Sequence, residues 1–407
     1  MFAALLAFNI YRAATQDVTP SEAWNYDRYV GVTWPESFRQ FEANNHVLNT
    51  LLERISTKRF HLTELSLRLP ALLGGLLYLW AVFRICRRCF PRAMPFAVGV
   101  MVLNPVVIDA LSEARGYGLA MAFWLLTVDL FLQCLEIFEV RKLNLAAMCL
   151  ALSVGGCPAF LVPALGLVAV FAWMVRRPLS RDLYLPLIVF LFVLFVLPLN
   201  RLLLSDLAAG PKSWPVTVWA LGAALAGIVF VAIRKRDSLV LMTTGTVLIA
   251  LLILLLAHKL IKAPFPDRGA IYFVPILTLS GLAILRKYPR ALMTAASICI
   301  AIYAVQFPIG PYHEARDFAG SREIAKAIRA EVRQRPARIA ASLELEPVMN
   351  YYRSRYRQGN WQRIGRKPLE GGYEYYVLTT ADAGWVNRLS LRVLRRTPGI
   401  ILATTRP

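Results

Sequence analysis

The chain has 407 residues, of which 57% are hydrophobic, and it carries a formal net charge of +21. A soluble chain is typically about 45–50% apolar, so this composition excludes an ordinary soluble globular protein. The charge could indicate a nucleic-acid partner, but no nucleic-acid motif accompanies it. Membrane orientation signals and attraction to anionic lipid account for the charge without nucleic acid.

The apolar residues lie in blocks long enough to cross ~30 Å of hydrocarbon, which takes roughly 20 helical residues. The sequence therefore predicts an all-α, polytopic membrane domain over residues 1–308 with about 11 spans. We expect the spans at about residues 1–14, 64–85, 94–112, 117–137, 144–157, 159–175, 184–203, 214–233, 238–257, 270–285 and 291–308. The first is only ~21 Å long as a helix, so either the true start lies upstream or this helix crosses incompletely.

The loops between these spans carry unequal charge. One alternate set of connections holds 15 Lys and Arg residues, and the short loops of the other set hold 6. The positive-inside rule assigns the first set to the cytoplasm. Residues 15–63, the turn at 113–117, the 258–269 loop and the C-terminal region then face outward, from a cytoplasmic (inner) membrane.

Two segments lack membrane-spanning character. Residues 15–63 form a long polar outer loop whose stretch "NNHVLNTLLERI" has the helical spacing of a helix lying in the interface. Residues 309–407 alternate helix and strand: "SREIAKAIRAEVRQR" has helical period, and "ARIAASLEL", "YEYYVLTT" and "GIILATTRP" are typical of strands. They predict a small extracytoplasmic α/β domain. Its 18 Lys and Arg against 9 Asp and Glu suit an anionic membrane surface.

Three outward segments carry polar side chains at the membrane border. The first loop offers Glu22, Asp27, Asn45 and His46, the turn in "LSEARGYGL" offers Glu113, Arg115 and Tyr117 above Asp109, and "FPDRGAIYFVP" offers Arg268 and Tyr272. Charged groups at membrane depth usually line a water-filled cavity or pair with one another. Arginines in such a cavity could hold a lipid-linked phosphate, and a carboxylate could take a proton from an incoming hydroxyl.

Each of these signals also has a plainer explanation. Arg115 could pair with Glu113 or extend to the interface, and Tyr117 could be an aromatic-belt residue. Glu22 could be a solvated charge at a helix start. His46 could be a polar position on an interfacial helix. Cys86 and Cys89 form a lone CxxC without a second pair, so no metal site is predicted there.

The segment "NNHVLNTLLERISTKRFHLTELSLRLPALLGGLLYLWAVFRI" followed by "LNPVVIDALSEARGYGLAMAF" resembles the GT-C glycosyltransferases. Within them, it is most similar to the bacterial protein-mannosyltransferase-like and aminoarabinose-transferase-like group. The resemblance covers residues 15–135 best, extends to the "DRGAIYFVP" loop, and beyond residue 309 concerns the architecture alone. The order of these motifs is more specific than any one of them.

The resemblance implies a polyprenyl-phosphate sugar donor and inverting transfer outside the cytoplasmic membrane. It implies that Arg115 meets the donor phosphate, that Tyr117 follows it, that His46 lies beside the donor, and that Arg268 lies near the lipid phosphate. Glu113, Asp109, Asn45 and Tyr272 would support them. Some relatives bind a divalent metal, but Asn45 and His46 do not form a ligand set; no cofactor is firmly predicted and a divalent metal stays open.

The family carries an acidic pair, Asp then Glu, early in the first outer loop. In "TPSEAWNY" the Asp position holds Ser21 and the Glu position holds Glu22. Because the family's Asp is the expected base, three readings stay open: Glu22 has taken the role, Asp27 has taken it, or the protein does not catalyse transfer.

The sequence thus predicts a membrane glycosyltransferase that moves a sugar from a polyprenyl-phosphate donor to an acceptor hydroxyl of a lipid, glycan or protein. Its partners would be that donor, the acceptor and the bilayer, with no nucleic acid. The alternative is a non-catalytic transporter or carrier of polyprenyl-linked glycans.

Overall fold

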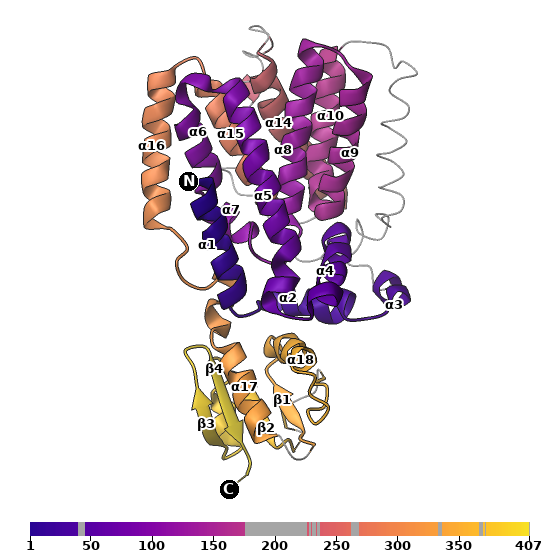
Figure 1. The fold of residues 1–407 in the computed structure, drawn as a ribbon, viewed down its shortest axis with the longest axis vertical. Coiled ribbons are helices and arrows are strands. Elements are labelled where there is room, and N and C mark those ends of the chain that lie inside the picture. Colours follow the sequence, from indigo (N-terminus) through magenta and orange to yellow (C-terminus); the bar gives the residue numbers. More distant parts are fainter. Residues whose placement is uncertain are drawn as a thin grey trace. The chain divides into compact units, whose positions relative to one another are not determined.

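The protein is mainly helical and divides into two compact units (Figure 1). A computed structural model describes residues 1–39, 45–175, 237–261, 268–332, 336–365, 369–370 and 372–406, and single positions between 226 and 233. Unit 1 comprises Met1–Leu6, Phe41–Asn49 and Pro70–Phe307, and unit 2 comprises Ala7–Gln40, Thr50–Leu69 and Pro308–Pro407. The predicted division into domains 1–308 and 309–407 stays a prediction.

Unit 1 consists of apolar helices, and Figure 1 shows α8, α9 and α10 running side by side. Two helices are shared between the units: α1 (Phe2–Thr15) begins in unit 1 and ends in unit 2, and α5 (Glu64–Cys89) begins in unit 2 and ends in unit 1. The others are α6 (Met94–Val102), α7 (Pro105–Ala110), α8 (Tyr117–Glu136), α9 (Val140–Gly156), α10 (Leu161–Val175), α14 (Ser238–Ile261), α15 (Phe273–Leu285) and α16 (Pro289–Val305), with short 3-10 turns η2 (Pro91–Ala93), η3 (Pro158–Phe160) and η5 (Arg268–Tyr272).

By length and composition, four of the described helices could cross a membrane: Glu64–Cys89, Tyr117–Glu136, Pro158–Val175 and Ser238–Leu260. Three shorter apolar helices accompany them, Pro91–Val102, Ala270–Leu285 and Pro289–Val305. A mostly helical membrane domain with a small C-terminal sheet was expected, and this architecture is confirmed. The expected span 184–203 and nearly all of 214–233 lie outside the described residues.

The expected span 94–112 is not one helix. α6 ends at Val102, and α7 begins at Pro105 after an interruption at Leu103 and Asn104. The side chain of Asn104 accepts a hydrogen bond from the amide of Val106 at 3.0 Å, and Pro105 occupies the first helical position, where its missing N–H is not needed. A capping residue and a proline therefore start a new helix inside a continuous apolar stretch.

Unit 2 combines the first loop with the C-terminal region. The loop forms α2 (Pro20–Asn25), the π-helical turn η1 (Tyr26–Val30), α3 (Trp34–Arg39) and α4 (Val47–Phe60), whose first three residues belong to unit 1. The C-terminal region forms η6 (His313–Phe318), α17 (Ser321–Glu331), β1 (Ile339–Ala341), α18 (Leu345–Arg355), β2 (Tyr375–Thr379), α19 (Gly384–Arg388), β3 (Arg392–Arg396) and β4 (Ile400–Thr404).

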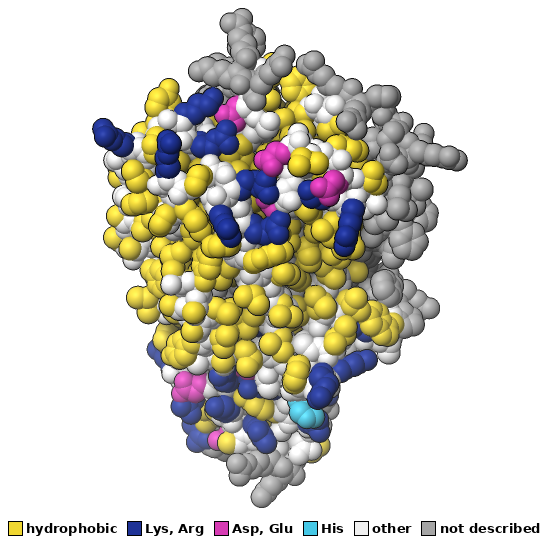
Figure 2. Space-filling model, turned by 45° about the horizontal axis from the view of Figure 1, so that its top comes forward, with side chains coloured by type: hydrophobic (Ala, Val, Ile, Leu, Met, Phe, Trp, Pro, Cys, Tyr) yellow, Lys and Arg dark blue, Asp and Glu magenta, His cyan; other side chains and the backbone are white. Residues whose placement is uncertain are grey.

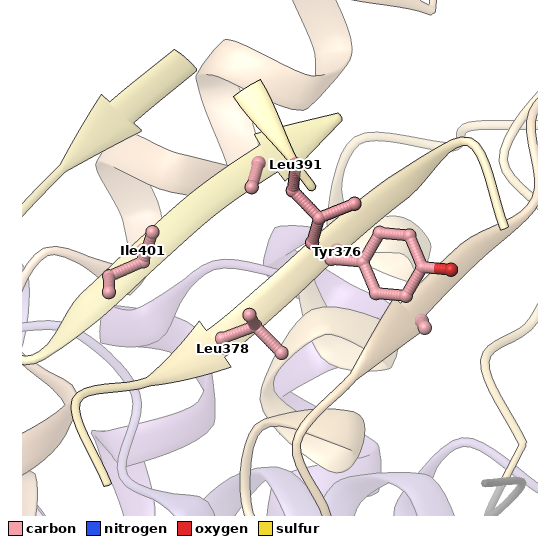
Figure 3. Packing of buried hydrophobic residues seen from close by; sticks show 6 residues of the cluster. Tyr376, Leu378, Leu391 and Ile401 are labelled. Carbon is pink, nitrogen blue, oxygen red and sulfur yellow. The ribbon is translucent and has the colours of Figure 1, made fainter. Parts of the chain in front are cut away.

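The sheet of unit 2 has the order β1-β2-β4-β3, with β1 and β2 parallel and the other pairs antiparallel. Every residue of β2 and β4 is buried. Figure 3 shows Tyr376, Leu378 and Ile401 on these strands with Leu391 beside them, the centre of one hydrophobic cluster. Strands β1, β2 and β4 lie within the predicted strand segments, whereas β3 was not predicted. Four of its five residues are exposed and three are arginines, which is typical of an edge strand protected by charge.

Candidate functional site

The "EARGYG" turn of unit 1 delivers its side chains at the start of α8. The turn is tight: the amide of Arg115 donates to the carbonyl of Glu113 at 2.6 Å, and Gly116 is the residue that precedes the first helical residue, Tyr117. A 20-residue helix carries partial positive charge at its N-terminus, where unsatisfied N–H groups can meet an anion. Arg115 therefore adds a full positive charge to an end that already favours anions.

Gly116 is required by packing. A Cβ atom there would lie 1.7 Å from the carbonyl oxygen of Gly156, the last residue of α9, and 3.2 Å from Cβ of His46. The first contact is to backbone, which cannot move aside as a side chain would. The absence of a side chain at this position thus lets the turn, the end of α9 and His46 come together.

His46 is anchored to the same turn. Its Nδ1 accepts a hydrogen bond from the amide of Gly116 at 2.9 Å, and its ring meets the ring of Tyr117 edge-on at 5.0 Å between centroids. Burial, and secondarily the charge of Arg115, lower the pKa of His46 from 6.5 to about 3. The imidazole is therefore neutral at physiological pH. Because Nδ1 is the acceptor, Nε2 carries the proton and can donate a hydrogen bond.

Arg115 is half-buried, and its guanidinium carbon lies 5.4 Å from the centre of the Tyr117 ring. This distance is short enough for a cation–π contact between the guanidinium and the ring. Of the expected supporting residues, Asn45 is buried next to His46, whereas Glu113 in the turn and Asp109 in α7 are half-buried.

Tyr272 and Arg268 lie on η5, also in unit 1. Tyr272 is fully buried, and its ring meets Phe160 of η3 edge-on at 5.9 Å. Its hydroxyl is buried and has no hydrogen-bond partner among the described residues. Arg268 is the first residue of η5.

Glu22 lies in unit 2 and performs two structural tasks there. It closes a capping box at the start of α2: Thr19 Oγ1 accepts from the amide of Glu22 at 3.2 Å, and Glu22 Oε2 accepts from the amide of Thr19 at 2.8 Å. Its carboxylate also forms a two-point ion pair with Arg68, through Nε at 2.8 Å and Nη2 at 2.7 Å. Both side chains are completely buried.

Arg68 uses all five of its N–H donors. Besides the two bonds to Glu22, Nη1 donates to the carbonyls of Ala13 at 3.1 Å and Gln16 at 2.8 Å, and Nη2 donates to the carbonyl of Asp17 at 2.7 Å. A guanidinium has five such donors. Arg68 therefore fastens the end of α1 and the start of the first loop to α5. The sequence pattern alone did not indicate this role for the arginine of "LRLP". The available signal was a cation in an apolar stretch near the start of α5, where a charge needs a partner.

Asp27 is the second residue of η1, which directly follows α2, and its side chain is 26% exposed. It forms an ion pair with Arg363 at 2.6 Å. Burial, and then the neighbouring Asp27 charge, raise the pKa of Tyr26. π-helical turns are uncommon and frequently occur at functional sites. Asp27 thus has a partly exposed carboxylate and lies on a π-helical turn.

The structure brings Arg115, Tyr117 and His46 together in unit 1, and it places Glu22 and Asp27 in unit 2. The gathering of both sets in one chamber stays a prediction. No group of three or more His, Cys, Asp or Glu side chains in the described part of the chain could hold a metal ion. Nδ1 of His46 accepts the hydrogen bond from Gly116, so this nitrogen is not available as a metal ligand.

No protein-family model matches the chain, and no curated protein matches it by sequence. Among solved structures, ArnT from Cupriavidus metallidurans bound to undecaprenyl phosphate matches with a TM-score of 0.56 and 13% identity, over 99% of this chain and 97% of that one. The chain has the GT-C fold of ArnT. The apo state of the same protein matches with a TM-score of 0.58 and 13% identity, over 99% and 96% of the two chains. The expected fold is confirmed over essentially the whole chain, including the C-terminal region.

Proposed function

We propose that this protein is an integral membrane glycosyltransferase that transfers a sugar from a polyprenyl-phosphate donor to an acceptor hydroxyl. Two findings support the proposal: the GT-C fold, and the undecaprenyl phosphate bound in the ArnT crystal structure of that fold. We further propose that transfer inverts the anomeric carbon and occurs on the outer face of the inner membrane, where the loop charges orient the first loop and the C-terminal region.

The observation that carries the proposal is the cluster at the start of α8. Arg115 supplies a fixed positive charge, Tyr117 supports it, and neutral His46 supplies an Nε2–H donor. A phosphate leaving group gains negative charge as the sugar departs, so donors and charges held ready for it lower the barrier. Arg268 would provide a second cation on the donor phosphate.

In the proposed reaction the acceptor oxygen bonds to the anomeric carbon while the bond from that carbon to the phosphate oxygen breaks. The acceptor proton passes to a carboxylate, which is Glu22 or Asp27. The environments favour Asp27, because its side chain is partly exposed, whereas the Glu22 oxygens are already engaged by Arg68 and Thr19. General-base assistance typically contributes ~10²–10⁴-fold.

The donor site is tested by offering the purified protein labelled polyprenyl-phosphate sugars and measuring donor binding and sugar transfer. Arg115→Ala should weaken donor binding by about 10–100-fold, because a hydrogen-bonded charge contributes roughly 1.5–3 kcal/mol. Arg115→Lys should recover part of the lost affinity, since lysine keeps the positive charge but lacks the planar guanidinium and its paired N–H donors. Arg141→Ala, an exposed arginine on α9, is the matched control. Equal binding by the Arg115→Ala and Arg141→Ala variants contradicts the proposal.

Asp27→Asn tests the base. We expect transfer to fall by about 10²–10⁴-fold with donor binding retained. Because Arg363 would then lose its ion partner, Arg363→Gln is the control: it breaks the same pair but leaves the carboxylate in place. Loss of transfer in both variants to the same degree would make the ion pair, and not the carboxylate, the important feature.

One observation favours a non-catalytic carrier instead. Ser21 stands where the resemblance leads one to expect an Asp, and the neighbouring Glu22 is held in a buried ion pair. A carrier would bind the donor through the α8 cluster without releasing the sugar. Tight donor binding with neither transfer nor hydrolysis, for every sugar and acceptor offered, would select this function.

A further inference from the structure

A second charged region lies at the other end of the helices of unit 1. α8 has 20 residues and therefore extends ~30 Å, from the Arg115 turn at its start to Glu136 at its end. At that second end are two adjoining cavities of about 370 Å³ and 320 Å³. Both are lined by Cys89 at the end of α5 and by Arg286 and Lys287 after α15.

A buried carboxylate organises the cations on the α5 side. Asp129 of α8 is 1% exposed and pairs with two arginines of α5: with Arg84 at 2.6 Å and with Arg88 at 3.1 Å. Arg88 also reaches Glu136 at 2.8 Å. Two guanidinium groups thus share one buried carboxylate, which fixes their positions.

A second buried carboxylate repeats the arrangement on the other side. Asp237, just before α14, is 8% exposed and pairs with Arg286 at 3.2 Å and with Lys287 at 3.4 Å. Asp237, Arg286, Lys287, Arg88 and Glu136 all line the larger cavity.

The cations of this cluster are more exposed than its two aspartates. The side chains of Arg88, Arg286 and Lys287 are 31%, 35% and 51% exposed, whereas both aspartates are nearly covered. Figure 2 shows Lys and Arg side chains gathered around a few acidic ones over this end of unit 1, bordered by hydrophobic side chains. An approaching anion therefore meets the cations first.

The charge of the cluster is positive overall. Among the described residues, four cations (Arg84, Arg88, Arg286 and Lys287) face three carboxylates, which leaves one positive charge in excess. Arg92, which lines the smaller cavity, raises that excess to two. An arginine has five donors and its ion pairs use only some of them. The cluster can therefore bind an anion of one or two charges without disturbing its own ion pairs.

We propose that these two cavities form a binding site for the phosphate headgroup of an anionic membrane lipid. The location supports a lipid over a soluble anion: α5 and α8 are long and apolar enough to cross a membrane, and their ends then lie at headgroup depth. Basic pockets between membrane helices are suited to such headgroups. The site is ~30 Å from the Arg115 turn along α8 and does not depend on the proposed transfer reaction.

The experiment uses the full-length protein in detergent and measures bound phosphatidylglycerol per protein by native mass spectrometry during lipid titration. The test variant is Arg92→Gln with Lys287→Gln. It removes the two positive charges in excess among the described residues, yet Asp129 keeps Arg84 and Arg88, and Asp237 keeps Arg286. We expect affinity for phosphatidylglycerol to fall about 25-fold, about fivefold for each cation lost, with no change for zwitterionic phosphatidylcholine.

The control is Arg87→Gln with Arg141→Gln, which removes two exposed cations that line neither cavity. It should change affinity less than about threefold. An equal loss in both double variants would mean general attraction to a basic face, and no loss in either would remove the site; both outcomes overturn the proposal. Displacement of the lipid by inorganic phosphate at equal concentration would overturn the assignment to a lipid. If the double variant unfolds early on heating, Lys287→Gln alone decides, with an expected fivefold loss.

Discussion

Replacing Glu22 by Gln separates a structural carboxylate from a catalytic one. The two oxygens of Glu22 accept from Nε and Nη2 of Arg68 and from the amide of Thr19, and both charged side chains are completely buried. In the Glu22→Gln variant the amide NH₂ faces a guanidinium donor, and the Arg68 charge stays buried without its partner. Breaking a buried ion pair in this way typically destabilises a protein by about 3–5 kcal/mol.

A variant at Arg68 provides a comparison for the loss of stability expected in Glu22→Gln. The Arg68→Met variant loses the ion pair and also the donors to the carbonyls of Ala13, Gln16 and Asp17, and a buried acceptor left unsatisfied costs about 1–3 kcal/mol. Arg68→Met should therefore destabilise more than Glu22→Gln. The double variant should destabilise no more than Arg68→Met alone, because no lone charge then remains.

The assay is unfolding of the purified protein by titration with SDS, together with donor binding and transfer. Glu36→Gln is the control, since Glu36 accepts from the amide of Thr33 at 3.0 Å in the same geometry but is exposed; its loss should cost at most about 1–2 kcal/mol. A Glu22→Gln variant with wild-type stability and a steep loss of transfer would refute the structural interpretation and make Glu22 the base.

Three further predictions concern single sites. Gly116→Ala should fail to fold or unfold well below the wild type on heating, because its Cβ would meet the backbone of Gly156 at 1.7 Å, whereas Gly281→Ala, with open space around it, should be neutral or slightly stabilising. His46 binds a proton more weakly in the folded state than in the unfolded one, with a pKa of about 3 against 6.5. The folded state is therefore most stable above pH 6.5, and it loses stability as pH falls toward 3, by up to about 1.4 kcal/mol per pH unit. His46→Asn should flatten the pH dependence of the unfolding midpoint by that amount, and an unchanged slope would contradict the assignment. Leu378→Ala should destabilise unit 2 by about 2–5 kcal/mol in SDS unfolding, since the side chain is 0% exposed.

The helical membrane architecture could be predicted from the sequence because apolar blocks of this length leave few alternatives. The "EARGYG" turn could be placed at a helix start for a related reason: a charged, glycine-containing segment interrupts two apolar runs. The interruption at Asn104 was also visible in principle, since Asn followed by Pro is a strong helix-start signal. Hydropathy alone does not indicate this interruption, because the apolar residues continue on both sides of it.

The role of Arg68 could not be obtained from sequence periodicity. The partners of this arginine are mostly backbone carbonyls of Ala13, Gln16 and Asp17, and carbonyls are present at every position of a sequence. Only the path of the chain determines which of them meet a guanidinium. The same reasoning applies to Gly116. This position must be glycine because of the backbone of Gly156, which is 40 positions further along the chain.

The arginines of this chain differ in what their surroundings leave them able to bind. Arg68 has all five donors engaged inside the protein and is buried, so it can hold the chain in place but cannot meet a ligand. Arg88 and Arg286 pair with buried aspartates and are about one-third exposed, which suits a headgroup at the membrane surface. Arg115 is half-buried beside a neutral imidazole and a helix N-terminus. Because a phosphate there would meet positive charge with little competing water, Arg115 is the arginine of these four that best fits a reacting anion.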